Sequence, residues 1–287
     1  MEIRNRIFFV TGGCSGLGLA VVDELIALGG LVCVFDRDQD EGKALETKHN
    51  DRLFVKAGSS KRLLFRRADV RSEPEVHSGL KNALETWPES TIGGLVHCAG
   101  VSAADKTVSS SGLAGSLEIF KTVIDINLTG SFNVSRLVAS EIVQQKRSID
   151  HTKTTQKATQ DHGVIILTSS TSYQDGQVGQ VGYAASKGGV ASMVLPMARD
   201  LARFGIRVNA IAPSLFDTQM GKSISPAVRD NLLKTVEYPS RFGDPQEFSS
   251  WHCYLDNHTD LNFCLSLPFF PSSQVIRLDA AGRMGKI

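Results

Sequence analysis

The chain has 287 residues, of which 41% are hydrophobic and 21% charged, with a formal net charge of +1. This composition supports a substantial core, and the near-neutral charge argues against a nucleic-acid partner or a polybasic membrane patch. No apolar run approaches the roughly 18 residues of a membrane span, and no secretory signal opens the chain. The five cysteines lack metal-ligand spacing, so we expect no bound metal and a reducing, cytoplasmic compartment.

The N-terminal part predicts a nucleotide-binding unit. An apolar strand over about 6–11 leads into Thr-Gly-Gly-Cys-Ser-Gly-Leu-Gly at 11–18, a helical pattern follows over 19–29, and a second strand at 31–35 ends in Asp36. Glycines let a backbone approach a pyrophosphate, a helix N-terminus attracts it, and an acid about 20 residues later binds ribose hydroxyls. Asp36 should repel a 2′-phosphate, which favours NAD over NADP, although Arg37 could pair with that phosphate or face solvent.

The remaining elements alternate between strands and helices. Residues 39–62 are charged and loop-rich, with a turn expected at Gly58-Ser59-Ser60. Residues 102–116 are expected to form a surface loop. The polar tract 144–162 is expected to be a mobile surface insertion. Strands are expected at 63–70, 94–98, 164–168, 206–211 and 275–279, and helices at 73–87 with Ser72 as N-cap, at 117–141 and from Tyr183 to about 204. This order predicts an α/β fold, with one Rossmann-like doubly wound parallel sheet, helices on both faces and a single domain over 1–287. His97 has no Cys/His cluster near it and is expected in the core.

Tyr183 and Lys187 carry the strongest chemical signal. Four residues apart on a helix, they share one face, so the ammonium can approach the phenol. A phenol has a pKa of about 10, and a neighbouring cation lowers it toward the range of acid–base catalysis. This spacing alone is weak evidence, because chance matches are frequent.

The chain resembles the short-chain dehydrogenase/reductase family over nearly its full length. The matching features are Thr11-Gly12-x-x-x-Gly16-x-Gly18, Asp36, Asp69-Val70, Cys98-Ala99-Gly100 (where the family usually has Asn-Ala-Gly), Asn127, Ser170, Tyr183 and Lys187. Within the family, stretches at 176–180, 195–201, 239–245 and 275–279 are similar to the type-2 3-hydroxyacyl-CoA dehydrogenases. The resemblance implies a small-molecule substrate (a secondary alcohol or ketone, such as a 3-hydroxyacyl-CoA or a hydroxysteroid), a homotetramer or homodimer, and, by analogy, a mitochondrial address.

The same resemblance implies residue roles. Tyr183 would be the acid–base residue, Lys187 would lower its pKa and bind the nicotinamide ribose, Ser170 would stabilise charge on the substrate oxygen, and Asn127 would interrupt its helix and hold a relay water. The nicotinamide cofactor would contact residues of several segments: Gly12, Ser15, Gly16, Leu17, Gly18, Asp36, Asp69, Val70, Cys98, Ala99, Gly100, Phe216 and Thr218, besides Tyr183 and Lys187.

Two stretches depart from the family pattern. The family usually has Pro-Gly where this chain has Pro213-Ser214. Residues 249–274 replace an amphipathic helix with an apolar run that holds two prolines and no clear helical period, which argues against a normal helix. This segment is a substrate-facing lid, a partner contact or an abnormal translated stretch.

Two other functions fit parts of the pattern. A non-catalytic NAD-binding regulator or scaffold would keep the fold, but retention of Ser170, Tyr183 and Lys187 argues against it. A methyltransferase also uses a glycine turn and an acid after the second strand, but it has no need for Tyr183 and Lys187.

Overall fold

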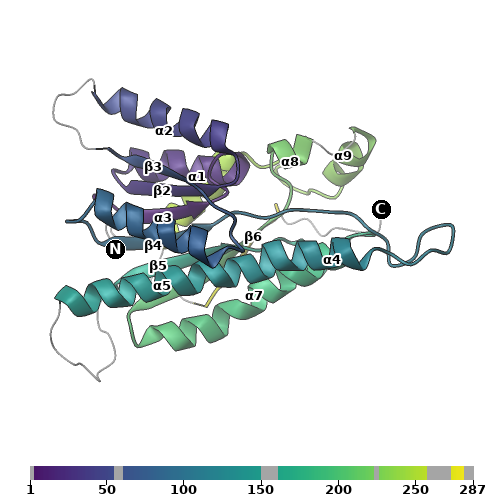
Figure 1. Cartoon of the computed structure of the whole chain (residues 1–287). Coiled ribbons are helices and arrows are strands. Elements are labelled where there is room, and N and C mark those ends of the chain that lie inside the picture. Colours follow the sequence, from purple (N-terminus) through teal and green to yellow (C-terminus); the bar gives the residue numbers. More distant parts are fainter. Residues whose placement is uncertain (1–2, 55–60, 150–160, 223–225, 257–272, 281–287) are drawn as a thin grey trace, which may run out of the picture.

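A seven-stranded parallel sheet organises the chain. The computed structural model describes residues 3–54, 61–149, 161–222, 226–256 and 273–280 (Figure 1). The strand order is β3-β2-β1-β4-β5-β6-β7, and every pairing is parallel. The strands are β1 (Ile7–Thr11), β2 (Leu31–Asp36), β3 (Leu63–Arg67), β4 (Ile92–His97), β5 (Gly163–Thr168), β6 (Ile206–Pro213) and β7 (Val275–Leu278). The predicted Rossmann-like fold is therefore confirmed.

Helices cover both faces of the sheet, as Figure 1 shows. Side chains of α3 (Glu73–Thr86), α5 (Gly130–Ile149) and α7 (Val181–Ala202) pack in one core cluster. Side chains of α1 (Gly16–Ala27), α2 (Gln39–Phe54) and α10 (Pro245–Asp256) pack in the other. The shorter elements are α4 (Leu117–Ile124), the π-helical turn η1 (Asp125–Thr129), α6 (Ser172–Asp175), α8 (Gln219–Lys222) and α9 (Pro226–Leu233).

Local sequence explains the elements that were predicted best. β1 is apolar throughout because both its faces are covered: Phe9 packs in one core cluster, and Phe8 and Val10 pack in the other. α3 begins where expected, because the Ser72 side chain accepts a hydrogen bond from the Glu75 amide at 3.4 Å. His97 is buried with 1% exposure, as predicted for a core histidine.

Two stretches that were not predicted as helices are helical. Residues 39–54 were expected as loop but form α2, in which Gly42 lies against the Phe65 ring so closely that a Cβ there would be 2.1 Å from it. Residues 249–256 were not expected to form a normal helix but belong to α10. Fully buried Phe248, in the first turn of α10, packs this helix against the core. Tertiary packing selects both helices over weak local signals.

The remaining predictions for surface segments have mixed outcomes. Residues 144–149 of the expected insertion continue α5, and 102–116 form no helix or strand. The turn at Gly58-Ser59-Ser60, residues 150–160 of the insertion and residues 257–272 of the atypical segment lie outside the described residues. None of the helices in the described ranges is long and apolar enough to cross a membrane.

Candidate functional site

A glycine turn at the carboxyl end of β1 opens the site. Gly12 and Gly16 have φ angles of +65° and +52°, a left-handed conformation that glycine adopts without strain. A Cβ on Gly18 would lie 2.1 Å from the Gly12 carbonyl oxygen, so the turn and α1 pack at a distance that only glycine permits. The Ser15 side chain at the helix N-cap makes no capping hydrogen bond. The N-terminus of α1 is therefore available to an anionic group.

The turn borders a cavity between the carboxyl ends of β1, β2 and β4. The strand order reverses here, because β2 and β4 lie on opposite sides of β1, and such a switch point is where doubly wound folds bind ligands. The cavity is lined by most of the predicted cofactor residues, namely Gly12, Ser15, Gly16, Leu17, Gly18, Asp36, Asp69, Val70, Cys98, Ala99, Gly100 and Thr218. Sequence reasoning missed Phe35, Ala68, Val101, Ile126 and Gln219, which adjoin motif residues in the chain.

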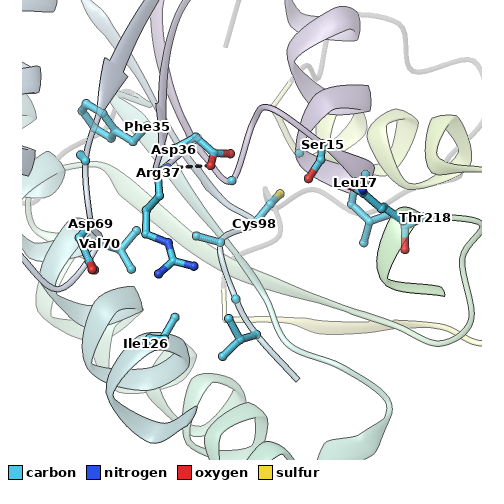
Figure 2. Close-up of a pocket in the computed structure, with 18 residues that line it drawn as sticks. Ser15, Leu17, Phe35, Asp36, Arg37, Asp69, Val70, Cys98, Ile126 and Thr218 are labelled. Carbon is cyan, nitrogen blue, oxygen red and sulfur yellow. Dashed lines mark hydrogen bonds between the residues drawn. The ribbon is translucent and has the colours of Figure 1, made fainter. Parts of the chain in front are cut away.

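Asp36 and Arg37 stand together at one end of the cavity. The Asp36 carboxylate accepts hydrogen bonds from the backbone amides of Cys14 at 3.1 Å, Arg37 at 2.7 Å and Asp38 at 3.2 Å. The bond from Cys14 ties the end of β2 to the glycine turn. Figure 2 shows the Arg37 side chain extending past Asp36 into the cavity, with its guanidinium between Asp69 and Cys98. Arg37 therefore lines the cavity rather than facing away from it.

Two further cavity residues have defined protonation states. A hydrogen bond from Arg71 lowers the pKa of Asp69 to about 2, so the Asp69 carboxylate stays charged. The ion pair between Arg71 and Asp69 measures 2.7 Å. Burial raises the pKa of the Cys98 thiol to about 11, and the Thr168 hydroxyl lies 3.6 Å from its sulfur. Cys98 is therefore a neutral thiol at the position where the family usually has asparagine.

The predicted catalytic residues gather beside the cavity. A Cβ on cavity-lining Gly100 would lie 3.2 Å from Asn127 Oδ1 and 3.4 Å from Lys187 Nζ, which places both groups directly behind this glycine. Lys187 Nζ donates a 2.7 Å hydrogen bond to the Thr168 carbonyl and lies 5.8 Å from the centre of the Tyr183 ring. Ser170 lies close enough to the Tyr183 hydroxyl to lower the pKa of that phenol by hydrogen bonding. All four predicted side chains therefore meet at the carboxyl edge of the sheet.

The electrostatics differ from the expectation for Tyr183 and Lys187. Burial raises the pKa of Tyr183, while the hydrogen bond with Ser170 acts in the opposite direction. Lys187 is not among the causes of this shift, and its ammonium donates to the Thr168 carbonyl, so the lowering expected from Lys187 stays a prediction. Burial also lowers the pKa of Lys187 to about 8. The environment favours the neutral form of both side chains.

Asn127 interrupts its helix as expected. It lies in the π-helical turn η1 between α4 and α5, and its side chain is fully buried. Its Oδ1 accepts from the Val101 amide at 2.8 Å, and its Nδ2 donates to the Val101 carbonyl at 2.9 Å and the Ser186 hydroxyl at 3.0 Å. Such turns occur frequently at functional sites. This one connects the loop after β4 with the helix that carries Tyr183.

Two predictions remain: the cofactor contact of Phe216 and the absence of a bound metal. Phe216 does not line the cavity; its ring packs edge-on against Phe248 with centroids 6.0 Å apart, while neighbouring Thr218 does line it. The ring packs in the core, and the predicted contact of Phe216 with the cofactor stays a prediction. Within the described ranges, no cluster of three or more His, Cys, Asp or Glu residues could hold a metal ion.

Comparisons with known proteins agree with this geometry. The model of the short chain dehydrogenase family matches residues 6–229, well over half of the chain. The chain belongs to the short-chain dehydrogenase family. It is 38% identical to "3-hydroxyacyl-CoA dehydrogenase type-2" of Bos taurus over 284 residues, covering 99% of this chain and 97% of that protein. The protein of the same description from Homo sapiens shows the same identity and coverage.

A solved relative extends the likeness to the fold. The crystal structure of 3-hydroxyacyl-CoA dehydrogenase type-2 from Mycobacterium avium superimposes with a TM-score of 0.80 at 30% identity, covering 99% of this chain and 98% of that one. Family membership identifies the chain as a nicotinamide-dependent oxidoreductase. The resemblance predicted from the sequence, including the likeness to the type-2 3-hydroxyacyl-CoA dehydrogenases, is confirmed.

Proposed function

We propose that this chain transfers a hydride between NAD and a secondary alcohol or ketone, with Tyr183 as the acid–base residue. The observation that carries the proposal is the grouping of four side chains beside a cavity built on a glycine turn: Asn127 and Lys187 lie next to Gly100, and Tyr183 lies near Lys187 and Ser170. The 3-hydroxyacyl-CoA dehydrogenase relatives favour a 3-hydroxyacyl-CoA as substrate, and a hydroxysteroid is the second class to test.

The cavity residues fit a dinucleotide. The glycine turn and the N-terminus of α1 would hold its pyrophosphate, and the Asp36 carboxylate would accept hydrogen bonds from the adenosine ribose. Asp69 and Val70 would flank the adenine, and Cys98 the adjacent ribose. The bound nicotinamide supplies the hydride chemistry. The protein's own task is to orient it and to move one proton.

Tyr183 and its neighbours would handle that proton. During ketone reduction, the neutral Tyr183 hydroxyl donates a proton to the carbonyl oxygen, and the raised pKa of the phenol keeps that proton available. Ser170 hydrogen-bonds the same oxygen as negative charge develops on it. During alcohol oxidation, the proton returns to Tyr183, and the hydrogen bond with Ser170 stabilises the phenolate that accepts it. Lys187 would bind the nicotinamide ribose from its anchor on Thr168.

NAD is the cofactor that Asp36 favours over NADP. The Asp36 carboxylate already accepts hydrogen bonds from three backbone amides. An adenosine 2′-phosphate beside it would bring a second negative charge, which the carboxylate would repel. Arg37 offers a counter-charge in the same cavity, so the discrimination should be moderate rather than absolute.

A homo-oligomer, tetrameric or dimeric, completes the proposal. Large apolar side chains are exposed on neighbouring helices, including Leu117, Ile119 and Phe120 on α4, Phe132 on α5 and Val181 on α7. Exposed apolar patches of this kind mark protein–protein contacts. Sedimentation velocity would measure the assembly, and a monomer at all concentrations would contradict this part of the proposal.

The deciding experiment is an absorbance assay of reduced nicotinamide with 3-hydroxyacyl-CoA thioesters, hydroxysteroids and simple secondary alcohols, using NAD and NADP in turn. We expect turnover with NAD, and a loss of roughly a thousandfold in kcat for Tyr183→Phe. NAD binding, followed by fluorescence quenching, should survive in that variant. NAD binding without turnover in the native chain would instead support a non-catalytic NAD-binding regulator.

A further inference from the structure

The segment after β5 is held by the neighbouring strand β6, which pairs in turn with the edge strand β7. The Ser169 amide donates to the Ile211 carbonyl at 2.8 Å, and the Thr171 amide donates to the Pro213 carbonyl at 3.0 Å. On the other side of β6, the Ser214 amide donates to the Leu278 carbonyl at 2.9 Å. The end of β6 therefore lies between the Ser170 segment and β7.

Arg277 on β7 reaches across this end of the sheet. Its Nε donates to Asp279 Oδ2 at 2.7 Å, its Nη1 donates to Gln174 Oε1 at 2.8 Å, and its Nη2 donates to Asp175 Oδ2. The side chains of Arg277 and Asp175 are only 16% and 13% exposed. Charge-assisted bonds with this little exposure are stronger than surface pairs and hold their partners in fixed positions.

The partners of Arg277 belong to the short helix that follows Ser170. Gln174 and Asp175 close α6, while Ser172 opens it, and the Ser172 amide donates to Ser170 Oγ at 3.2 Å. The Tyr173 amide donates to the Ser170 carbonyl at 3.0 Å. The position of α6 thus orients both the backbone and the hydroxyl of Ser170. Because Ser170 Oγ accepts from Ser172, its own hydrogen remains available to Tyr183, whose pKa Ser170 lowers.

Packing leaves α6 little freedom on its other side. A Cβ on Gly176, just beyond α6, would lie 3.0 Å from the Cβ of Ala184, which directly follows Tyr183. The Gln180 side chain accepts from the Ser172 hydroxyl and from the Gln177 amide, each at 3.3 Å. A shift of α6 therefore changes the geometry between Ser170 and Tyr183 directly.

We propose that Arg277 is a positioning residue for the reaction: by binding Asp175 and Gln174 it holds α6 in place, and α6 holds the Ser170 hydroxyl against Tyr183. The kinetic consequence rests on the proposed function, whereas the contact itself does not. An Å-scale misplacement of a catalytic group costs on the order of a hundredfold in rate. We expect Arg277→Gln to lower kcat by roughly tenfold to a hundredfold and to change NAD affinity less than about twofold.

The test combines a spectroscopic and a kinetic readout. The chain has four tyrosines, so ¹³C labelling at tyrosine Cζ gives few resonances, and Tyr183→Phe assigns the one that matters. Ser170→Ala marks the position of that resonance when the hydrogen bond is absent. We expect Arg277→Gln and Asp175→Asn each to move the Tyr183 resonance most of the way to that position. The double variant should move it no further, and Arg277→Lys should restore part of the shift.

Arg207→Gln is the matched control. Arg207 pairs with Asp161 at 2.9 Å, with side-chain exposures of 8% and 12%, at the opposite end of β6. It should cost stability, as Arg277→Gln does, but leave the Tyr183 resonance and kcat in place. A resonance that stays at its native position in both Arg277→Gln and Asp175→Asn would overturn the inference. A native chain that turns over no substrate while the resonance moves would refute the proposed function alone, because the hydrogen-bond readout requires no activity.

Discussion

Lys187→Met should change the pH dependence of stability. Lys187 is 4% exposed, and burial lowers its pKa from 10.5 to about 8. At about 1.4 kcal/mol per pKa unit, this difference corresponds to about 3 kcal/mol by which the buried charge destabilises the native state. Met removes that charge, but it leaves the Thr168 carbonyl without its 2.7 Å donor, at a cost of about 1–3 kcal/mol. Near neutral pH the two terms offset each other, so Lys187→Met should be about as stable as the native chain or up to about 2 kcal/mol more stable.

The pH dependence separates the two terms. Between about pH 8 and the ordinary lysine pKa, the unfolded chain holds the Lys187 proton and the folded chain does not, so native stability rises with pH. The variant lacks this titration, whereas its unpaired carbonyl does not titrate. The stability of Lys187→Met minus that of the native chain should therefore fall by about 2–3 kcal/mol from about pH 7 to about pH 10.

Urea unfolding followed by tryptophan fluorescence measures this difference. Other titrating groups are common to both chains and cancel when the two are subtracted. Lys81→Met is the control, because the Lys81 side chain is 70% exposed on α3, and its difference from the native chain should not change with pH. A Lys187→Met difference that is equally independent of pH would refute the idea that a buried charge here opposes folding. The variant should meanwhile lose most of its catalytic rate.

Three further predictions address the cofactor, the core and the buried histidine. Asp36→Asn should raise the KM for NAD about tenfold and narrow the preference over NADP, measured by steady-state kinetics with both cofactors. Phe248→Ala should cost about 3–5 kcal/mol in urea unfolding, because its side chain is fully buried, whereas Tyr238→Ala, 84% exposed, should cost under about 0.5 kcal/mol. Burial lowers the pKa of His97 to about 3, so below the ordinary histidine pKa unfolding takes up a proton, and native stability is lost as the pH is lowered. His97→Gln should remove about 2 kcal/mol of that loss at about pH 5 in acid-unfolding curves, and His77→Gln, on an exposed residue, should remove none.

The first half of the site could be read from sequence because its signals are local. A buried strand, a glycine turn, a helix and a strand ending in Asp36 follow one another without interruption, and each step restricts the backbone in its own way. The structure places this whole unit as expected, and it also shows Gly12 and Gly16 at positive φ. Short-range geometry of this kind does not depend on what the rest of the chain does.

The failures share the opposite cause. α2 has a mostly polar sequence, and its position depends on contacts such as Gly42 against Phe65, more than 20 residues later in the chain. α10 forms where no normal helix was expected, and its buried Phe248 packs edge-on against Phe216, which follows the sixth strand. Helical spacing correctly predicted that Lys187 lies near Tyr183. Helical spacing could not predict that the ammonium binds the Thr168 carbonyl at the end of β5.

The pKa shifts around the site share one effect, a shift away from the charged form, and this effect bears on catalysis. Burial raises the pKa of Tyr183 and Cys98, and lowers the pKa of Lys187 and His97. Each shift disfavours the charged form of a buried side chain, and the low-polarity surroundings screen any new charge weakly. Well-placed hydrogen bonds are therefore an effective means of stabilising an oxyanion that forms there. This makes the exact placement of the Ser170 hydroxyl important, and it explains why a guanidinium on the last strand, through α6, would bear on the rate.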